Sequence, residues 1–214
     1  MHIHILLSIQ LLSDVGTFIS VEKLLEGNAR FASEVFQDGS TFADCLKGQS
    51  PHTLVIACAD SRVPPELIFG AAPGEIFVHR NIGNMVPPGD WNLATVIEYA
   101  VCHLGVKTVA VLGHGRCGAI RAVASNHGGH DAYIPGWVYH GRQAYVTLVE
   151  RMPYPDDAMA QIEWLCELEK ENIRLQLKHL RTYPVITTAL SANEISVVGL
   201  YYDMATGIVS QIEE

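Results

Sequence analysis

Three short, mostly apolar runs stand out in the first half of the chain. They are "LVIAC" (54–58), "EIFVHR" (75–80) and "TVAVLGH" (108–114). Runs of this length without regular polar alternation are typical of strands that are covered on both faces, as in parallel sheets. Between the last two runs, residues 92–105 place apolar side chains at three- and four-residue spacing and end in Gly105, which indicates a helix. The pattern therefore predicts a strand–helix–strand unit.

The two ends of the chain add further elements. Residues 21–36 have the period of an amphipathic helix with Ser20 as its candidate N-cap, and its apolar face would pack either on the chain's own sheet or on a partner. Near the C-terminus, "ISVVGLYYD" (195–203) and "IVSQI" (208–212) flank turn residues and predict a hairpin. The predicted fold class is α/β, with a central, mostly parallel β-sheet flanked by helices, a C-terminal antiparallel edge strand or hairpin and an N-terminal helical arm. Residues 122–160 show no clear pattern.

Length and composition favour a single globular unit. The chain has 214 residues, of which 49% are hydrophobic, and we expect one domain over residues 21–214 with an extension of unclear role at 1–20. The opening "MHIHILLSIQLL" is shorter than the ~20 residues of a membrane span and lacks the basic start of a secretory signal. We therefore expect a cytoplasmic location, with organellar targeting by the extension left open.

The charge of the chain disfavours two classes of partner. There are 14 basic and 23 acidic residues, which give a formal net charge of −9. A negative chain repels phosphate backbones and anionic membrane surfaces, so we expect neither nucleic acid nor a membrane as a partner. The five cysteines are odd in number and widely spaced, which suits a reducing compartment. Three of them are expected to be small core residues: Cys45, Cys102 and Cys166.

The other two cysteines and a histidine follow strand ends. Cys58 and His114 each lie where an apolar run stops, and Cys117 comes three residues later, at the start of the next helix. The carboxyl ends of parallel strands meet at one edge of a sheet, so these side chains are expected to converge there. Two thiolates and one imidazole are a known zinc set, and three protein ligands leave a fourth position for water. The spacing predicts a catalytic zinc site.

Two other kinds of chemistry are open to the same segments. "GHGRCG" (113–118) matches the glycine pattern of a dinucleotide site, but it comes late in the chain and contains two potential metal ligands. A cysteine nucleophile in "CADSR" (58–62) would need a cradle of backbone amides for an anionic substrate, and Asp60 would repel such a substrate. Both interpretations rank below zinc.

These segments together resemble the β-class carbonic anhydrases. "CADSR", "RNIGNMV" (80–86) and "GHGRCG" occur in the order that the family has, as do "LLEGNARF", "GQSP", "PGEIFVHRN", "VIEYAV" and "YYDMATG". The resemblance runs from about Val21 to the C-terminal hairpin. Val55 stands three residues before Cys58, where the bicarbonate-controlled bacterial subgroup has tryptophan, so the chain is more similar to the plant-like group.

The resemblance implies an activity and a site. It implies a catalytic domain that binds one Zn²⁺ per chain through Cys58, His114 and Cys117 and reversibly hydrates carbon dioxide to bicarbonate and a proton by a zinc-bound hydroxide. Asp60 and Arg62 would form a catalytic pair beside the metal, and Asp60 could become the fourth zinc ligand in a closed state. We expect a resting site that is open to water.

The resemblance also implies a substrate pocket and an assembly. Its carbon dioxide or bicarbonate would be contacted by Gln49, Phe77, Tyr99 and the backbone amide of Gly118. Judged without the resemblance, Phe77 is equally a core strand residue and Tyr99 a helix-packing residue. Family members form homodimers or larger even-numbered homo-oligomers with pocket residues shared across the interface, and the helix at 21–36 suits such a contact.

Two alternative functions keep the zinc site. The first is a carbonyl sulfide or carbon disulfide hydrolase, which is similar to this family and uses the same ligand set. The second is a non-enzymatic bicarbonate sensor, against which the presence of Asp60, Arg62 and Gln49 argues, because a sensor need not keep the groups that activate water. Among the histidines outside the zinc set, the pair in "HGGH" (127–130) is interpreted as part of a loop.

Overall fold

The computed structural model describes residues 21–36, 42, 44–125 and 131–213. The predicted extension at 1–20, the candidate cap Ser20 and the "HGGH" segment lie outside the described residues. The chain divides into two compact units, residues 1–47 and Gly48–Glu214. The prediction of one catalytic domain over 21–214 stays a prediction, and each unit is described by itself.

The described residues of the first unit contain one long helix. This helix, α2 (Val21–Glu34), occupies the region in which the periodicity predicts a helix, and it buries none of its residues. The ring of Phe31, in the last part of α2, contacts the rings of Phe36 and Phe42, and the three centroids are 5.3–6.4 Å apart. A short 3₁₀ helix, η1 (Asp44–Lys47), ends the unit. The apolar face of α2 is therefore exposed in its own unit.

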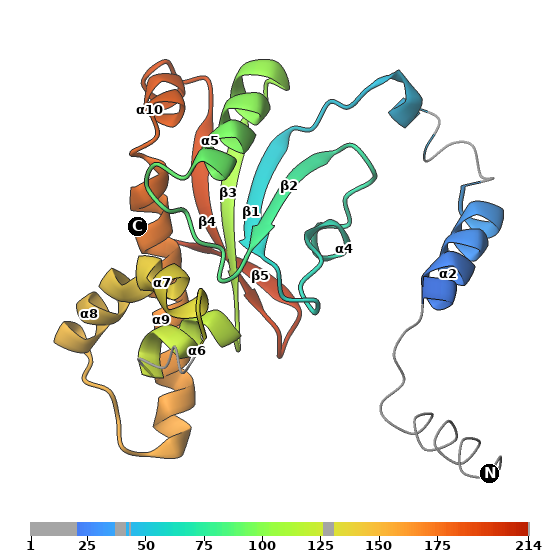
Figure 1. The fold of residues 1–214 in the computed structure, drawn as a ribbon. Helices are drawn as coiled ribbons and strands as arrows, with labels where there is room; N and C mark the ends of the chain where they lie inside the picture. Colours follow the sequence, from blue (N-terminus) through green and yellow to red (C-terminus); the bar gives the residue numbers. More distant parts are fainter. Residues whose placement is uncertain (1–20, 37–41, 43, 126–130, 214) are drawn as a thin grey trace, which may run out of the picture. The chain divides into compact units, whose positions relative to one another are not determined.

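The second unit is built on a five-stranded sheet with the order β2-β1-β3-β4-β5 (Figure 1). Its strands are β1 (Thr53–Cys58), β2 (Ile76–Asn81), β3 (Thr108–His114), β4 (Ser196–Asp203) and β5 (Ile208–Ile212). The first four strands are parallel, and β5 runs antiparallel to β4. The predicted α/β class, the mostly parallel sheet and the C-terminal hairpin are confirmed.

Apolar side chains cover both faces of the central strands. Leu54 and Ile56 of β1 pack in one core cluster, which α5 (Trp91–Glu98), α9 (Ala158–Leu180) and α10 (Pro184–Ser191) complete. Val55 and Ala57 point to the opposite face, toward α4 (Pro65–Phe69). Neighbouring strand residues point to opposite faces, so a strand covered on both sides must be apolar at every position. This explains the continuous apolar runs.

The long helix α9 packs unusually close to the sheet. A Cβ on Gly113 of β3 would lie 2.7 Å from side-chain carbons of Ile173. A Cβ on Gly199 of β4 would lie 2.8 Å from another side-chain carbon of the same Ile173. Both strands therefore require glycine where α9 crosses them. Asp157 caps the helix by accepting a hydrogen bond from the Ala160 N–H at 2.8 Å. Helix α9 was not predicted from the sequence.

The remaining helices include the region without a clear pattern. It contains α7 (Ile134–Val138), the 3₁₀ turn η3 (Tyr139–Gly141) and α8 (Arg142–Arg151), and α6 (Gly118–Ser125) begins before it. The predicted helix at 92–105 is present as α5 followed by a π-helical turn, η2 (Tyr99–His103), and it ends at Gly105 with φ of 68°. No helix in the described part of the chain has both the length and the apolar character that a bilayer span requires.

The expectation for three cysteines was partly wrong. Cys45 and Cys102 are exposed and Cys166 is half-buried, whereas all three were expected in the core. Cys45 lies in the short η1 helix and Cys102 lies in the η2 turn, and each of these elements leaves its cysteine side chain exposed. The two cysteines that are fully buried are Cys58 and Cys117.

Candidate metal centre

Three metal-ligating side chains meet at the carboxyl ends of β1 and β3. Cys58 is the last residue of β1, His114 is the last residue of β3, and Cys117 directly precedes α6. Their ligand atoms all lie within 4.8 Å of one another, and the two sulfur atoms are 4.0 Å apart. Around a tetrahedral ion with metal–sulfur bonds of about 2.3 Å, two sulfur atoms would be about 3.8 Å apart. The cluster therefore has the dimensions of a metal site.

The imidazole of His114 is held in the orientation that a metal ligand needs. Its Nδ1 lies 2.9 Å from the carbonyl oxygen of Gly115, and a carbonyl accepts, so this nitrogen carries the proton. Its Nε2 then presents a lone pair, and this buried atom has no hydrogen-bond partner among the described residues. A buried polar atom without a partner is costly, and a cation between Nε2 and the two sulfur atoms would satisfy it. The donor set thus fits a bound metal ion.

Buried polar groups surround the two thiols. The Gly83 N–H donates to Cys58 Sγ at 3.4 Å. The Cys117 N–H donates to Glu169 Oε1 at 2.8 Å, and the hydroxyl of Tyr201 donates to Glu169 Oε2 at 2.9 Å. Glu169 is only 4% exposed, and this burial raises the pKa of its carboxyl. The backbone of one ligand is therefore fixed by a carboxylate that lies deep in the protein.

The electrostatic surroundings favour a negative charge on the sulfur pair. A hydrogen bond from Cys117 lowers the pKa of Cys58, against the effect of burial, and His114 and the Gly83 N–H add to the lowering. The same hydrogen bond and burial raise the pKa of Cys117. The two thiols share one proton in the absence of a cation, since two neighbouring buried thiolates would repel each other. A divalent cation is what allows both to ionise.

Asp60 and Arg62 form a closely paired unit beside the cluster. Arg62 Nε donates to Asp60 Oδ1 at 2.9 Å and Nη2 donates to Oδ2 at 2.7 Å. The Arg62 backbone N–H also donates to Oδ1, at 3.0 Å. These bonds hold the pKa of the Asp60 carboxyl well below its usual range. Asp60 is not a member of the three-residue cluster, so the structure places it on Arg62.

Arg80 holds the loop that carries this pair. No role for Arg80 was predicted from the sequence. Its Nε donates to the carbonyl of Cys58 at 2.9 Å, and its Nη2 donates to the carbonyl of Asp60 at 2.6 Å. Arg80 comes from β2, the strand next to β1, and it lies one residue before the position opposite Cys58. Arg80 is the first residue of "RNIGNMV", one of the segments on which the resemblance rests, so the sequence did draw attention to this position.

The four predicted pocket residues are divided between the two ends of the sheet. Gly118 follows Cys117 directly and has open space beside its Cα. Phe77 pairs with Leu54, whereas Cys58 pairs with Asn81, so Phe77 lies four residues, or about 13 Å, along the strand from the level of the cluster. Tyr99 contacts Phe77, with ring centroids 6.0 Å apart, and the exposed Gln49 precedes the amino end of β1. Within one chain, only Gly118 lies beside the cluster.

Comparisons with known proteins agree with this geometry. A family profile described as "Carbonic anhydrase" matches residues 53–209. The carbonic anhydrase of Pseudomonas aeruginosa is 34% identical over 195 residues, which cover 89% of this chain and 86% of that protein.

Solved structures give the same result. A β-carbonic anhydrase of Coccomyxa, solved in complex with acetazolamide, is 30% identical with a TM-score of 0.81, and the match covers 93% of this chain and 88% of that chain. One of two tetrameric β-carbonic anhydrases of Sordaria macrospora is 30% identical with a TM-score of 0.80, over 90% of this chain and 96% of that chain. The likeness in both cases covers sequence and fold together.

Proposed function

The chain belongs to the β class of the carbonic anhydrase family, and from this premise we propose that a zinc ion bound by Cys58, His114 and Cys117 carries its reaction. The family's activity is that of a carbonate dehydratase, which hydrates carbon dioxide to bicarbonate reversibly. The observation that supports the proposal most is the unpartnered His114 Nε2, which lies buried beside two sulfur atoms. Two thiolates and an imidazole suit zinc and leave a fourth position open.

The chemistry divides between the metal and the paired residues. When zinc is bound, it lowers the pKa of a water molecule to about 7 and so supplies hydroxide for addition to carbon dioxide. Asp60 stays ionised because Arg62 is bonded to both of its oxygens. Its Oδ2 accepts one hydrogen bond, from Arg62, and keeps a lone pair, so it can accept a further bond from the attacking water. Asp60 would thereby orient the nucleophile.

The pairing of Asp60 with Arg62 supports an open resting site. Arg62 Nη2 also donates to the carbonyl of Arg116 at 3.3 Å, so the guanidinium is held by contacts on two sides. For Asp60 to reach the cluster, it would have to break two charge-assisted hydrogen bonds to Arg62. We propose that the fourth position is available to water at neutral pH and that the closed state forms only when this pairing is lost.

The positions of the other pocket residues support a shared site in a homodimer or a larger even-numbered homo-oligomer. Phe77, Tyr99 and Gln49 lie toward the amino ends of the strands, away from the cluster of their own chain. A second copy could bring the same three residues to the cluster of the first, and Tyr99 is exposed enough for such a contact at 45%. The relatives from Sordaria macrospora are tetrameric, which agrees with an assembly of this kind.

A zinc measurement combined with a stopped-flow assay of carbon dioxide hydration tests the proposed chemistry. We expect about one zinc per chain in the wild type. Asp60→Ala should retain the metal and lose most of the activity, because only the acceptor for the attacking water is removed. Asp131→Ala, at an exposed aspartate, is the matched control and should match the wild type. A metal-free active enzyme, or full activity in Asp60→Ala, would refute the proposal.

Mixing two inactive variants tests whether the pocket is shared. Cys117→Ser removes a metal ligand, and Tyr99→Ala removes a pocket residue. If Tyr99 serves the metal of the partner subunit, a mixed dimer has one site with both an intact cluster and an intact pocket. Activity should then appear on mixing, after exchange of subunits has been verified with a mass tag. Exchange without recovered activity would show that Tyr99 serves its own chain.

A further inference from the structure

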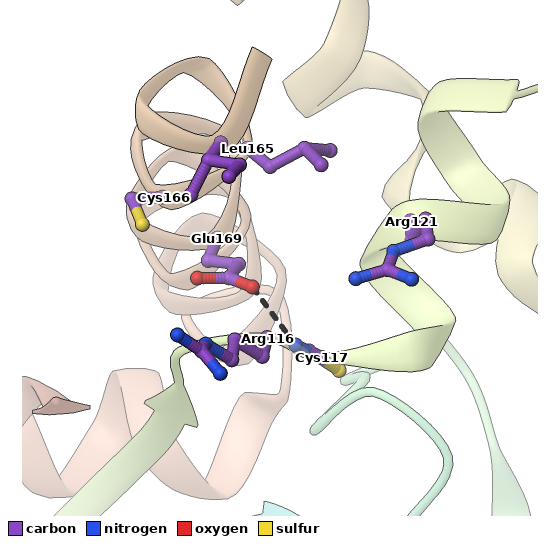
Figure 2. Close-up of a pocket in the computed structure, with 7 residues that line it drawn as sticks. Arg116, Cys117, Arg121, Leu165, Cys166 and Glu169 are labelled. Carbon is purple, nitrogen blue, oxygen red and sulfur yellow. Dashed lines mark hydrogen bonds between the residues drawn. The ribbon is translucent and has the colours of Figure 1, made fainter. Parts of the chain in front are cut away.

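A hollow of about 300 Å³ lies between α6 and α9, and Cys117 of the metal cluster is one of its lining residues (Figure 2). Its lining includes two arginines, a buried carboxylate and an apolar wall, formed by Arg116, Arg121, Ile162, Leu165, Cys166 and Glu169. This volume lies at the lower end of the range for small-molecule sites. The mechanism proposed above does not use the hollow.

The charges around the hollow favour an anion. No carboxylate among the described residues forms an ion pair with Arg116 or Arg121. The four ion pairs found in that part of the chain involve other arginines and lysines. The carboxylate of Glu169 is engaged by the Cys117 N–H and the Tyr201 hydroxyl, both neutral donors. Figure 2 shows the Arg121 guanidinium directed from α6 toward the α9 side of the hollow. Figure 2 shows the Arg116 side chain directed away from Arg121, so Arg121 is the guanidinium that faces the hollow, and no carboxylate of the described residues is bound to it.

The balance of charge selects a monoanion. Two arginines contribute two positive charges and the carboxylate of Glu169 contributes one negative charge, so one further negative charge makes the local sum zero. A doubly charged phosphate would leave an excess negative charge near Glu169, which the low-dielectric surroundings penalise. A carboxylate also matches the planar fork of a guanidinium.

The opposite wall of the hollow favours a hydrocarbon part on the ligand. Ile162 and Leu165 are three residues apart and therefore lie on the same side of α9. Cys166 extends the surface that they form. Ile162 is 52% exposed, so an apolar group that covers it would remove apolar area from water. A second hollow, of about 290 Å³, shares Arg121, Ile162 and Leu165 with the first and gives a chain room to extend.

We propose that this hollow binds a small organic monocarboxylate, separate from the substrate of the metal centre. The carboxylate binds the Arg121 guanidinium, with Arg116 at the edge of the hollow, and the hydrocarbon part contacts Ile162 and Leu165. The bound molecule lies next to the backbone of Cys117, which is itself a lining residue. Since anions can also bind a zinc ion directly, the test has to separate the two locations.

Calorimetric titration of the zinc-loaded protein with sodium pentanoate and with sodium acetate, at equal ionic strength, tests the proposal. Pentanoate has three more methylene groups, so we expect it to bind about tenfold more tightly than acetate. Arg121→Ala should weaken pentanoate binding about tenfold, and Arg121→Lys should weaken it less, because a lysine keeps the charge but not the fork. Lys178→Ala, an exposed site elsewhere on α9, is the matched control and should bind as the wild type does.

Several results would overturn the proposal. Pentanoate binding that is unchanged in Arg121→Ala would place the anion at the metal, and the absence of any pentanoate binding would leave the hollow without a ligand. Inorganic phosphate that binds more tightly than pentanoate would contradict both the charge argument and the role of the apolar wall. Zinc content and the far-ultraviolet circular dichroism of each variant confirm that a lost signal is not lost folding. Since these readouts do not depend on activity, failure here leaves the proposed function standing.

Discussion

The hydrogen bonds of the buried Glu169 carboxylate can be removed by substitution, which measures how much they contribute to folding stability and to zinc affinity. The carboxylate accepts the Cys117 N–H at 2.8 Å and the Tyr201 hydroxyl at 2.9 Å, and all three residues are buried. The substitution Glu169→Ala removes both acceptors and leaves two donors inside the protein without a partner. Each such donor costs about 1–3 kcal/mol, so we expect the free energy of unfolding to fall by roughly 2–6 kcal/mol.

Two matched variants separate the two hydrogen bonds. Tyr201→Phe removes only the hydroxyl and leaves the bond between Glu169 and Cys117 in place. We expect it to lower the free energy of unfolding by about 1–2 kcal/mol and to leave zinc affinity nearly unchanged. Glu169→Gln keeps the size of the side chain and one acceptor oxygen, so its effect on stability should lie between those of the other variants. Only the loss of the bond to Cys117 should weaken zinc binding, by about 10–100-fold, since groups that orient a metal ligand have effects of this size.

Urea unfolding of the zinc-loaded variants gives the stability, and competition with a chromophoric chelator gives the zinc affinity. Protomer concentration has to be equal in all samples, because the stability of an oligomer depends on it. The reasoning would be refuted by equal losses of zinc affinity in Glu169→Ala and Tyr201→Phe. It would also be refuted if Glu169→Ala kept both its stability and its zinc affinity.

Four further predictions rest on other parts of the structure. Arg62 lowers the pKa of Asp60, so Asp60 has the same charge throughout the range of the assay. Asp60→Asn should therefore reduce the hydration rate by one constant factor, about 100-fold, from about pH 6 to about pH 9. The midpoint of the stopped-flow pH profile should not shift. The stability that this pair contributes should be present above about pH 4 and disappear in acid titration as the pH falls toward the lowered pKa. Chelation of zinc should lower the melting temperature of the wild type, because an ion that binds only the folded chain stabilises it, whereas Cys117→Ser should show no such shift. Gly113→Ala places a methyl group 2.7 Å from side-chain carbons of Ile173, so it should cost about 1–3 kcal/mol in urea unfolding, and a double-mutant cycle with Ile173→Ala should show that the cost shrinks.

The sheet could be predicted from the sequence because its physical requirement is local. A strand covered on both faces has to be apolar at each position, so β1 and β3 appear in the sequence as unbroken runs. The helix α9 meets a different requirement. It buries Glu169, Glu171, Asn172 and Gln176 along with its apolar residues, and these polar positions interrupt the stripe that helical periodicity would reveal. Each of them also has a partner outside α9, such as the Cys117 N–H for Glu169 and the Val86 N–H for Gln176, so the sequence near α9 does not identify them as buried.

The three residues of the metal cluster could be predicted for a similar reason. The buried Glu169 that holds the backbone of Cys117 could not. Cys58 and His114 follow strand ends, and the topology of a parallel sheet brings such positions together without knowledge of side-chain packing. Glu169 lies 52 residues after Cys117 in the sequence, in a helix that had not been predicted. Phe77 and Tyr99 were chosen by resemblance alone, and the register of β1 and β2 places them toward the other end of the strands. Under the proposed shared site, their role depends on a second copy of the chain.

A single peptide group connects the two sides of the proposed active centre. The carbonyl of Arg116 accepts a hydrogen bond from Arg62 Nη2, and the N–H of Cys117, which belongs to the same peptide group, donates to Glu169. In a planar trans peptide the C=O and N–H point in opposite directions, so the Asp60–Arg62 pair and the buried carboxylate hold this group from opposite sides. Arg116 adopts φ of 58°, a left-handed conformation that is uncommon for a residue with a side chain. The cost of that conformation is offset by the two hydrogen bonds, and together they fix the direction in which Cys117 presents its sulfur atom to the cluster.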